Sequence, residues 1–250
     1  MKKYQFIIIL IILHVSTPLF AIHLSFTTQN LEPFSYLGDT GPSGPSVDIA
    51  TAVCDEMKAD CIIDLYPWRR AYYEVKRARA NGIFFIGKNP DREKWLVFSP
   101  PVVQTEYGFF VNINNPLVYK NPNHIEGYIV GVFGPSNTSA SLREIKIDMT
   151  NFYIDMEDND EAGFRKLSVK RVNAVYSNRD VGYSLIKKLG LSNIRYAGAH
   201  CKLYYYFAFN PQLTPKEWIE RFNETYRILY HAGTIHQILK KYHMSPVPLN

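Results

Sequence analysis

The sequence predicts an α/β protein, and three observations support this fold class. Strand-like and helix-like segments alternate along most of the chain, which is typical of a sheet covered by helices. Hydrophobic residues make up 46% of the chain and charged residues 20%, which excludes a disordered chain and a multi-span membrane protein. The length of 250 residues allows a large core and a division into two domains.

The first half of the chain is expected to alternate between strand and helix. Residues 24–28 form a short strand, and a loop rich in Gly, Pro and Ser follows over 38–46. Ser46 has an N-capping side chain, so we expect a helix over 47–59 whose apolar face holds Val47, Ala50, Val53, Cys54 and Met57. The elements expected next are a strand over 61–65, a helix over 68–80, a buried strand over 83–86, and extended segments over 96–99 and 107–112.

A second region begins near Asn114, where turn-forming residues become frequent. Ser141 and Glu144 have the spacing of a capping box, which indicates a helix start near Ser141. The other elements expected here are strands over 128–133, 152–155, 173–176 and 204–210, helices over 161–168 and 181–189, and closing helices over 215–230 and 234–242.

Residues 1–21 have the features of a secretory signal peptide. Lys2 and Lys3 precede an unbroken apolar run over 6–13, and Ala21 is a small residue suited to cleavage. The alternative is a membrane anchor, but the run is shorter than the roughly 20 residues that a membrane span needs. The residue directly after Ala21 is not a cysteine, so the mature chain would have no N-terminal cysteine to carry a lipid. We therefore expect cleavage after Ala21 and a soluble protein exported to the periplasm.

Export permits disulfides, and the chain has three cysteines. Cys54 lies near the end of an expected helix and Cys61 opens the next strand, a turn that could bring both within bridging range. Cys201 is left over, and we expect it to be a partly buried, inert thiol. The histidines show no metal-ligand spacing, and the net charge of +5 is too dispersed for nucleic acid. We predict no metal, no cofactor and no nucleic-acid partner.

Short motifs in a consistent order along the mature chain resemble those of one family. They lie at 33–36, 47–50, 66–71, 91–93 and 98–100 in the first half, and at 130–132, 136–138, 171–175, 232–234 and 239–242 in the second. On these motifs the chain resembles the extracellular solute-binding protein family 3, the periplasmic receptors of amino-acid ABC transporters. The spacing of Cys54 and Cys61 also resembles the small disulfide loop of the enteric receptors, which implies a Cys54–Cys61 bridge.

The resemblance implies a type II periplasmic binding protein, with two α/β lobes joined by two strands and a ligand enclosed between them. Each lobe is then a mixed sheet flanked by helices. Lobe 1 is expected over 22–111 and 208–250, and lobe 2 over 112–207, with crossings at 109–114 and 204–210. The implied protein is a monomer without enzymatic activity, and its partners are a small-molecule ligand and an inner-membrane permease.

The resemblance also implies a ligand site. Arg92 is expected to bind the ligand's carboxylate, since a guanidinium can do so in bidentate fashion; the alternative is a solvated surface arginine. Ser136, Asn137 and Thr138 precede a helix and offer hydroxyl and N–H donors to an anion, or act only as helix caps. Trp68 is expected either to stack on the ligand or to lie in the core. The remaining candidates for ligand contact are Phe85, Gly87, Phe133, Asn178 and Asp180.

Several positions depart from the pattern of the family. Family members carry an acidic residue that pairs with the ligand's ammonium, and this chain has Asn178 at that position. Asp180, two residues later, is the candidate to replace it. Thr28 stands where receptors for basic amino acids have an acid, and Leu31 replaces a stacking tyrosine. The loop before Arg92, residues 85–88, lacks the family's serines. These departures argue against a lysine, arginine or histidine receptor.

Two other functions stay open. An enzyme on the same fold, like the periplasmic cyclohexadienyl/arogenate dehydratases, needs an acid in the cleft, for which Asp180 and Glu32 are the candidates. A sensory module that reports a ligand to a membrane receptor shares the binding physics and differs only in its partner.

Overall fold

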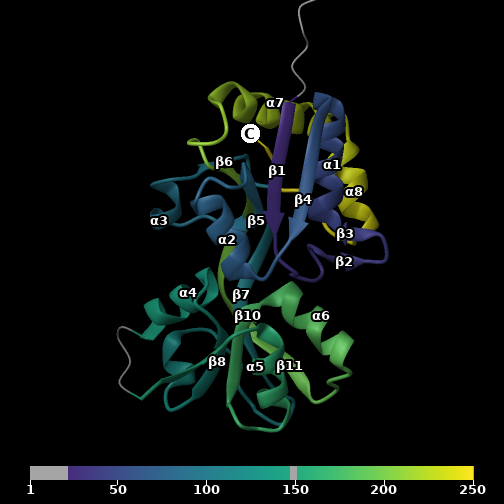
Figure 1. Ribbon diagram of the computed structural model, residues 1–250. Coiled ribbons are helices and arrows are strands. Elements are labelled where there is room, and N and C mark those ends of the chain that lie inside the picture. The colour runs from purple at the N-terminus through teal and green to yellow at the C-terminus, as the bar shows by residue number, and fades with distance from the viewer. Residues whose placement is uncertain (1–21, 147–150, 250) are drawn as a thin grey trace, which may run out of the picture.

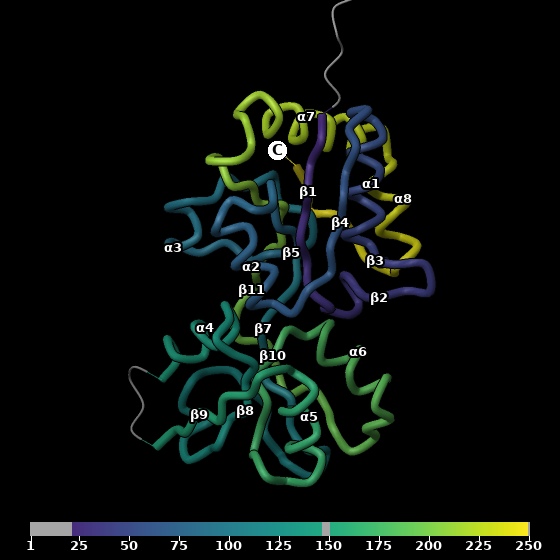
Figure 2. The backbone as a smooth tube through the Cα atoms, in the orientation of Figure 1, coloured from purple at the N-terminus to yellow at the C-terminus, as the bar shows by residue number. Residues whose placement is uncertain are grey.

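The computed structural model describes residues 22–146 and 151–249, which form two globular lobes stacked end to end (Figure 1). The predicted signal peptide, residues 1–21, lies outside the described residues. Within them, nine strands form one sheet in the order β4-β1-β5-β11-β7-β10-β8-β9, with β6 paired to β11. Figure 2 shows the backbone passing between the lobes at β7 (Val103–Asn112) and β11 (Ile194–Phe209). The predicted α/β, two-lobed fold class is confirmed.

Three parallel strands form the centre of the first lobe. β1 (Ile22–Thr28) pairs in parallel with β4 (Ala59–Leu65) and with β5 (Gly82–Gly87), so the helices between them are crossover connections. The ring of Phe26 on β1 lies 6.4 Å or less from the rings of Phe84, Phe207, Phe209 and Phe222, which makes an aromatic core. The remaining elements are β2 (Tyr36–Gly38), β3 (Gly41–Ser43), α1 (Pro45–Met57), α2 (Trp68–Lys76), α3 (Pro90–Glu93), β6 (Val97–Phe98), α7 (Lys216–His231) and α8 (Thr234–Lys241).

The second lobe repeats this plan. β8 (Ile129–Phe133) pairs in parallel with β9 (Tyr153–Glu157) and with β10 (Ala174–Asn178). Its helices are α4 (Asn137–Lys146), α5 (Asp160–Ser168), α6 (Arg179–Leu189) and the short 3-10 helix η1 (Pro122–Ile125). Alternate residues of β7 face opposite sides of the sheet, so Phe109 packs on Tyr176 while Phe110 packs on Phe164.

The predicted apolar face of the first long helix is confirmed, because all five of its named residues are buried. Cys54 on this helix, α1, is bonded to Cys61 on β4, with the two Cα atoms 6.2 Å apart. Cys201 is a free, half-buried thiol. No helix among the described residues has both the length and the apolar character needed to cross a bilayer.

Both predicted capping residues are wrong. α1 begins at Pro45 with Gly44 as N-cap, and the Ser46 hydroxyl instead donates to the carbonyl of Phe34 at 2.8 Å. α4 begins at Asn137, four residues before Ser141. The Ser141 hydroxyl lies 2.9 Å from that of Tyr176. In both cases the serine makes a contact with a residue distant in the sequence, which local capping patterns cannot reveal.

The last strand is much longer than predicted. β11 covers 16 residues and pairs with β7 from Ile194 to Tyr205 and with β5 from Tyr205 to Phe209. Its first part is half exposed and lacks a continuous apolar run, so only the buried end resembled a strand in the sequence. The lobe limits 22–111, 208–250 and 112–207 stay a proposal. Residues 107–111 of β7 pair with β10 of the second lobe, and residues 205–209 of β11 pair with β5 of the first. Each strand therefore changes lobe a few residues before the expected limit.

Candidate functional site

The parallel strands of both lobes end at a cleft between the lobes. Segments that follow β1, β4 and β5 line the cleft from the first lobe, and segments that follow β8, β9 and β10 line it from the second. Open α/β sheets bind ligands outside the carboxyl ends of their strands, where the loops can vary without disturbing the core. The cleft is therefore the candidate binding site.

The cleft has three adjoining compartments. The inner compartment has a volume of about 40 Å³ and is enclosed by both lobes. The first outer compartment, of about 760 Å³, lies between the segment after β1 and helices α5 and α6. The second outer compartment, of about 770 Å³, lies between α2, α3 and the start of α4. Trp68 borders all three, so this indole stands where they meet.

The structure gathers the predicted site residues, with one exception, around the inner compartment. Those that line it are Trp68, Phe85, Gly87, Arg92, Phe133, Ser136, Asn137, Thr138 and Asn178. They come from both lobes and from segments far apart in the sequence. Asp180 is the exception, because it lines none of the three compartments.

Arg92 is a buried cation beside the cavity. The side chain of Asn89 caps the short helix α3 by accepting a hydrogen bond from the backbone N–H of Arg92 at 2.9 Å. This bond holds the backbone of Arg92 in place at the edge of the cleft. Arg92 is only 5% exposed, and its Nη1 donates to the carbonyl of Gly87 at 2.6 Å. Its guanidinium carbon lies 5.1 Å from the ring centre of Trp68. Burial lowers the pKa of this guanidinium, and no ion pair of the described residues includes it. Arg92 is therefore a positive charge that no carboxylate of the described residues contacts directly.

The start of α4 supplies hydrogen-bond donors opposite Arg92. Ser136 and Ser139 cap this helix reciprocally, since each side-chain oxygen accepts the other residue's backbone N–H at 3.0–3.1 Å. The backbone N–H groups of Asn137 and Thr138 belong to the first turn, where a helix has no internal acceptors. The Asn137 side chain also accepts a 2.8 Å bond from Asn89 across the cleft. Arg92, Asn137 and Thr138 therefore border the same inner compartment.

Phe85 has a strained backbone beside the cavity. Its φ of 54° is in the left-handed region, which is a genuine outlier for a bulky residue. At this point the pairing of β5 with β11 shifts register, so Phe85 is the extra residue of a bulge. Its ring is held by Phe34 and Tyr205, with ring centres 5.5 and 5.8 Å away. The surrounding aromatic packing therefore maintains a conformation that shapes the wall of the inner compartment.

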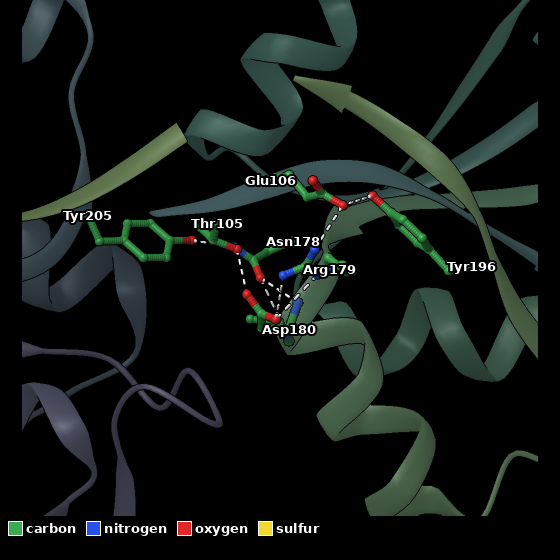
Figure 3. A network of polar contacts seen from close by, with 8 residues as sticks. Thr105, Glu106, Asn178, Arg179, Asp180, Tyr196 and Tyr205 are labelled. Carbon is green, nitrogen blue, oxygen red and sulfur yellow. Dashed lines mark hydrogen bonds and ion pairs between the residues drawn. The ribbon is translucent and has the colours of Figure 1, made fainter. Parts of the chain in front are cut away.

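Asn178 and Asp180 belong to a polar network at the hinge strands, shown in Figure 3. The side-chain carbonyl of Asn178 accepts the backbone N–H of Asp180 at 2.9 Å and caps α6, while its amide donates to Thr105 and Tyr205. Asp180 accepts the Thr105 hydroxyl at 2.7 Å and lies 3.4 Å from Arg179. These contacts occupy both side chains, so the Asp180 carboxylate is a structural part of the hinge.

Asp160 is the cleft carboxylate that the sequence analysis missed. It is the first residue of α5, follows the N-cap Asn159, and lines both the inner and the first outer compartment. One carboxylate oxygen accepts the Ser177 hydroxyl at 2.7 Å. Burial raises the pKa of Asp160 to about 6, and the bond from Ser177 offsets only part of this effect. The sequence did hold one signal for this residue. Asp160 closely follows the strand β9, and the other site residues also follow parallel strands, at the carboxyl edge of the sheet.

Contacts between the lobes close the cleft at its edges. Lys188 on α6 lies 2.8 Å from Glu32, and Arg69 on α2 lies 3.8 Å from Asp158. These pairs and the Asn89–Asn137 bond join the two lobes directly. Among the described residues, no group of His, Cys, Asp or Glu side chains is arranged to hold a metal ion.

A cleft between two α/β lobes, crossed by two strands, defines the class of two-lobed periplasmic binding proteins. Solved structures share this fold. A histidine kinase sensor domain with similarity to periplasmic binding proteins has a TM-score of 0.81 and 18% identity, over 91% of this chain and 98% of that chain. An ancestral arginine-binding protein bound to arginine has a TM-score of 0.78 and 19% identity, over 88% and 97%.

A third structure, an ABC uptake transporter substrate-binding protein from Streptococcus pneumoniae with bound histidine, has a TM-score of 0.77 and 14% identity, over 88% of this chain and 91% of that chain. The model of the bacterial extracellular solute-binding proteins, family 3, matches residues 25–245. The chain belongs to this family, as the motifs predicted. No curated protein sequence matches the chain.

Proposed function

We propose that the protein is a periplasmic solute-binding protein that captures a small carboxylate-bearing polar solute, an amino acid, for an ABC transporter. One observation carries the proposal: Arg92 is a buried guanidinium at the cavity wall without an acidic partner among the described residues. Burying an unpaired charge is costly, so a carboxylate ligand would relieve that cost and gain charge-assisted hydrogen bonds. The predicted signal peptide places the protein in the periplasm, and we expect a monomer.

Capture would require the lobes to separate. The inner compartment, at about 40 Å³, has room for roughly one water molecule, which is less than any amino acid needs. Movement at the hinge strands β7 and β11 would open the cleft, and the contacts of Glu32 with Lys188 and of Asn89 with Asn137 would form again on closure. The closed form would then present the surface that a permease recognises.

We expect weak binding of lysine and arginine. Thr28, which stands where receptors for these ligands have an acid, is buried, and its hydroxyl lies 3.3 Å from both the Ser35 hydroxyl and the Phe84 carbonyl. It therefore brings no negative charge to the cleft. A ligand with a second positive charge would therefore find no counter-charge at this position of the cleft.

A sensory module is the second candidate. The similarity to a histidine kinase sensor domain covers 98% of that domain, so the same binding unit occurs in sensing proteins. Ligand capture would be identical, and only the protein that reads the closed form would differ.

Thermal unfolding of the mature protein against the amino acids, small peptides and dicarboxylates tests the proposal. A solute that binds only the folded state raises the midpoint of unfolding. Mass spectrometry of the recovered solute must then find it unchanged. Consumption of prephenate or arogenate would instead identify an enzyme, and the absence of any shift with carboxylates would contradict carboxylate capture.

A further inference from the structure

Two charged side chains of opposite sign face the inner compartment from opposite lobes. Arg92 comes from α3 in the first lobe, and Asp160 from the start of α5 in the second. Each has a neutral protein partner, the Gly87 carbonyl for the arginine and the Ser177 hydroxyl for the aspartate. Neither takes part in an ion pair within the described part of the chain, although neighbouring acids such as Glu161 and Glu157 do.

The position of Asp160 is not explained by helix capping alone. A carboxylate in the first turn of a helix interacts favourably with the helix dipole. That interaction does not require the carboxylate to face a cavity, and Asn159 already supplies the capping bond, to Ala162 N–H at 2.8 Å. Asp160 is partly buried, and a carboxylate withdrawn from water without a cation is costly. The geometry instead suits a positively charged group that arrives from outside.

We propose that Asp160 binds the ammonium group of a zwitterionic amino acid whose carboxylate is held by Arg92. This inference rests on the proposed function and identifies the ligand class, because a plain carboxylic acid would leave Asp160 unpaired. Asp160 thereby does what neither Asn178 nor Asp180 does, since both of those side chains are occupied within the hinge network. Arg92 and Asp160 are the two charged residues among those that line the inner compartment. One bound zwitterion would therefore balance both charges.

The test compares amino acids with their deaminated analogues in wild type and in Asp160→Asn. The probes are the twenty proteinogenic amino acids and, for those that bind, the acids that lack only the amino group, such as propionate for alanine and glutaramate for glutamine. Asparagine keeps the acceptor for Ser177 and removes only the charge. Asp155→Asn is the matched control, because its carboxylate pairs with Lys166 in the same lobe and lines none of the compartments.

We expect wild type and Asp155→Asn to prefer the amino acid by about 30-fold or more, and Asp160→Asn to lose that preference. If Asp160 served only to stabilise the start of α5, Asp160→Asn would lower the free energy of unfolding but would leave the preference for the amino acid over its deaminated analogue unchanged. Retention of the preference by Asp160→Asn, or equal binding of both probes by wild type, overturns the role of Asp160 and leaves carboxylate capture intact. A wild type that binds no carboxylate at all contradicts both proposals.

The pH dependence of binding gives an independent readout. In the closed cleft, burial raises the pKa of Asp160 to about 6, so the carboxyl of this form becomes protonated as the pH falls below 6. Binding of an ammonium group then weakens by up to about tenfold per pH unit. Affinity should be constant from about pH 7 up to the pH at which the ligand's own amino group loses its proton. In Asp160→Asn it should not fall as the pH drops below about 6. The other titratable or charged groups facing this part of the cleft are Glu32, Tyr66, Arg92, Tyr107, Asp158, Glu161, Arg165, Lys188 and Tyr205. A pH profile that Asp160→Asn leaves unchanged would assign the titration to one of these groups and refute the inference.

Discussion

Replacement of Arg92 by methionine should weaken carboxylate binding by about 30-fold or more while leaving the fold intact. Methionine retains much of the buried volume beside Trp68 and removes only the charge and the donors. In the free protein the guanidinium makes a 2.6 Å bond to the Gly87 carbonyl and lies over two aromatic rings, while being buried without a counter-charge. Loss of these contacts lowers the free energy of unfolding, whereas removal of a buried, unpaired charge raises it. Because the two effects oppose each other, we expect the stability of the ligand-free protein to change by no more than about 2 kcal/mol.

The effect on binding is larger because the ligand's charge would be left unpaired. Removing one partner of a buried, hydrogen-bonded charge pair costs about 2–5 kcal/mol, or roughly 30-fold to 4,000-fold in Kd. A ligand at 100 times its Kd stabilises the wild type by about 2.7 kcal/mol, which raises the unfolding midpoint of a protein of this size by roughly 5–11 °C. A 30-fold weaker variant would show a shift below roughly 4 °C at the same concentration.

Thermal shift and titration calorimetry, with the amino acid that gives the largest wild-type shift, measure this difference. Arg92→Lys should be intermediate, because lysine keeps the charge but cannot bind a carboxylate in bidentate fashion. Arg70→Met is the matched control, since Arg70 also stacks on an aromatic ring, that of Tyr66 at 3.8 Å, but lines no compartment. A full thermal shift in Arg92→Met would show that the carboxylate is bound elsewhere.

Two further predictions concern stability. A Cβ at Gly182 on α6 would lie 2.2 Å from the buried ring of Phe110, so Gly182→Ala should lower the free energy of unfolding by about 1–3 kcal/mol. A Cβ at Gly163 on α5 would have no neighbour closer than 3.5 Å, so Gly163→Ala should be neutral or stabilise by up to about 1 kcal/mol. Urea unfolding measures both variants, and equal effects would contradict the packing described. The Cys54–Cys61 bond closes a short loop, with a sequence separation of 7, so its reduction should lower the free energy of unfolding by about 2 kcal/mol. Unfolding with and without reductant measures this loss. Two free thiols in the unreduced protein would contradict the bond.

The order of strands and helices could be predicted because each element carries its own pattern of apolar residues. The face of α1 is an example, since residues at helical spacing must be buried together whatever they pack against. The length of β11 could not be predicted in this way. Its half-exposed first part is a strand because it pairs with β7, and that pairing depends on a segment more than 80 residues away.

The candidate site was largely predictable from motif order. Arg92 and the segment Ser136 to Thr138 follow strands whose carboxyl ends meet in the cleft, so their meeting follows from topology. The choice among acidic residues was not predictable. Asp180 and Asp160 both stand at the start of a helix, and the sequence offers no local difference that tells which one faces the cleft.

The sequence by itself determined the family, the two-lobed α/β architecture and a guanidinium suited to a carboxylate, because these depend on local patterns and on the order of motifs. Only the tertiary structure decided which acid stands across the cavity from that guanidinium. A carboxylate's surroundings are set by residues brought from other strands, here Thr105 beside Asp180 and Ser177 beside Asp160. Desolvation and pairing are properties of those long-range contacts. An aspartate therefore supports the crossing strands at position 180 and faces the cleft at position 160.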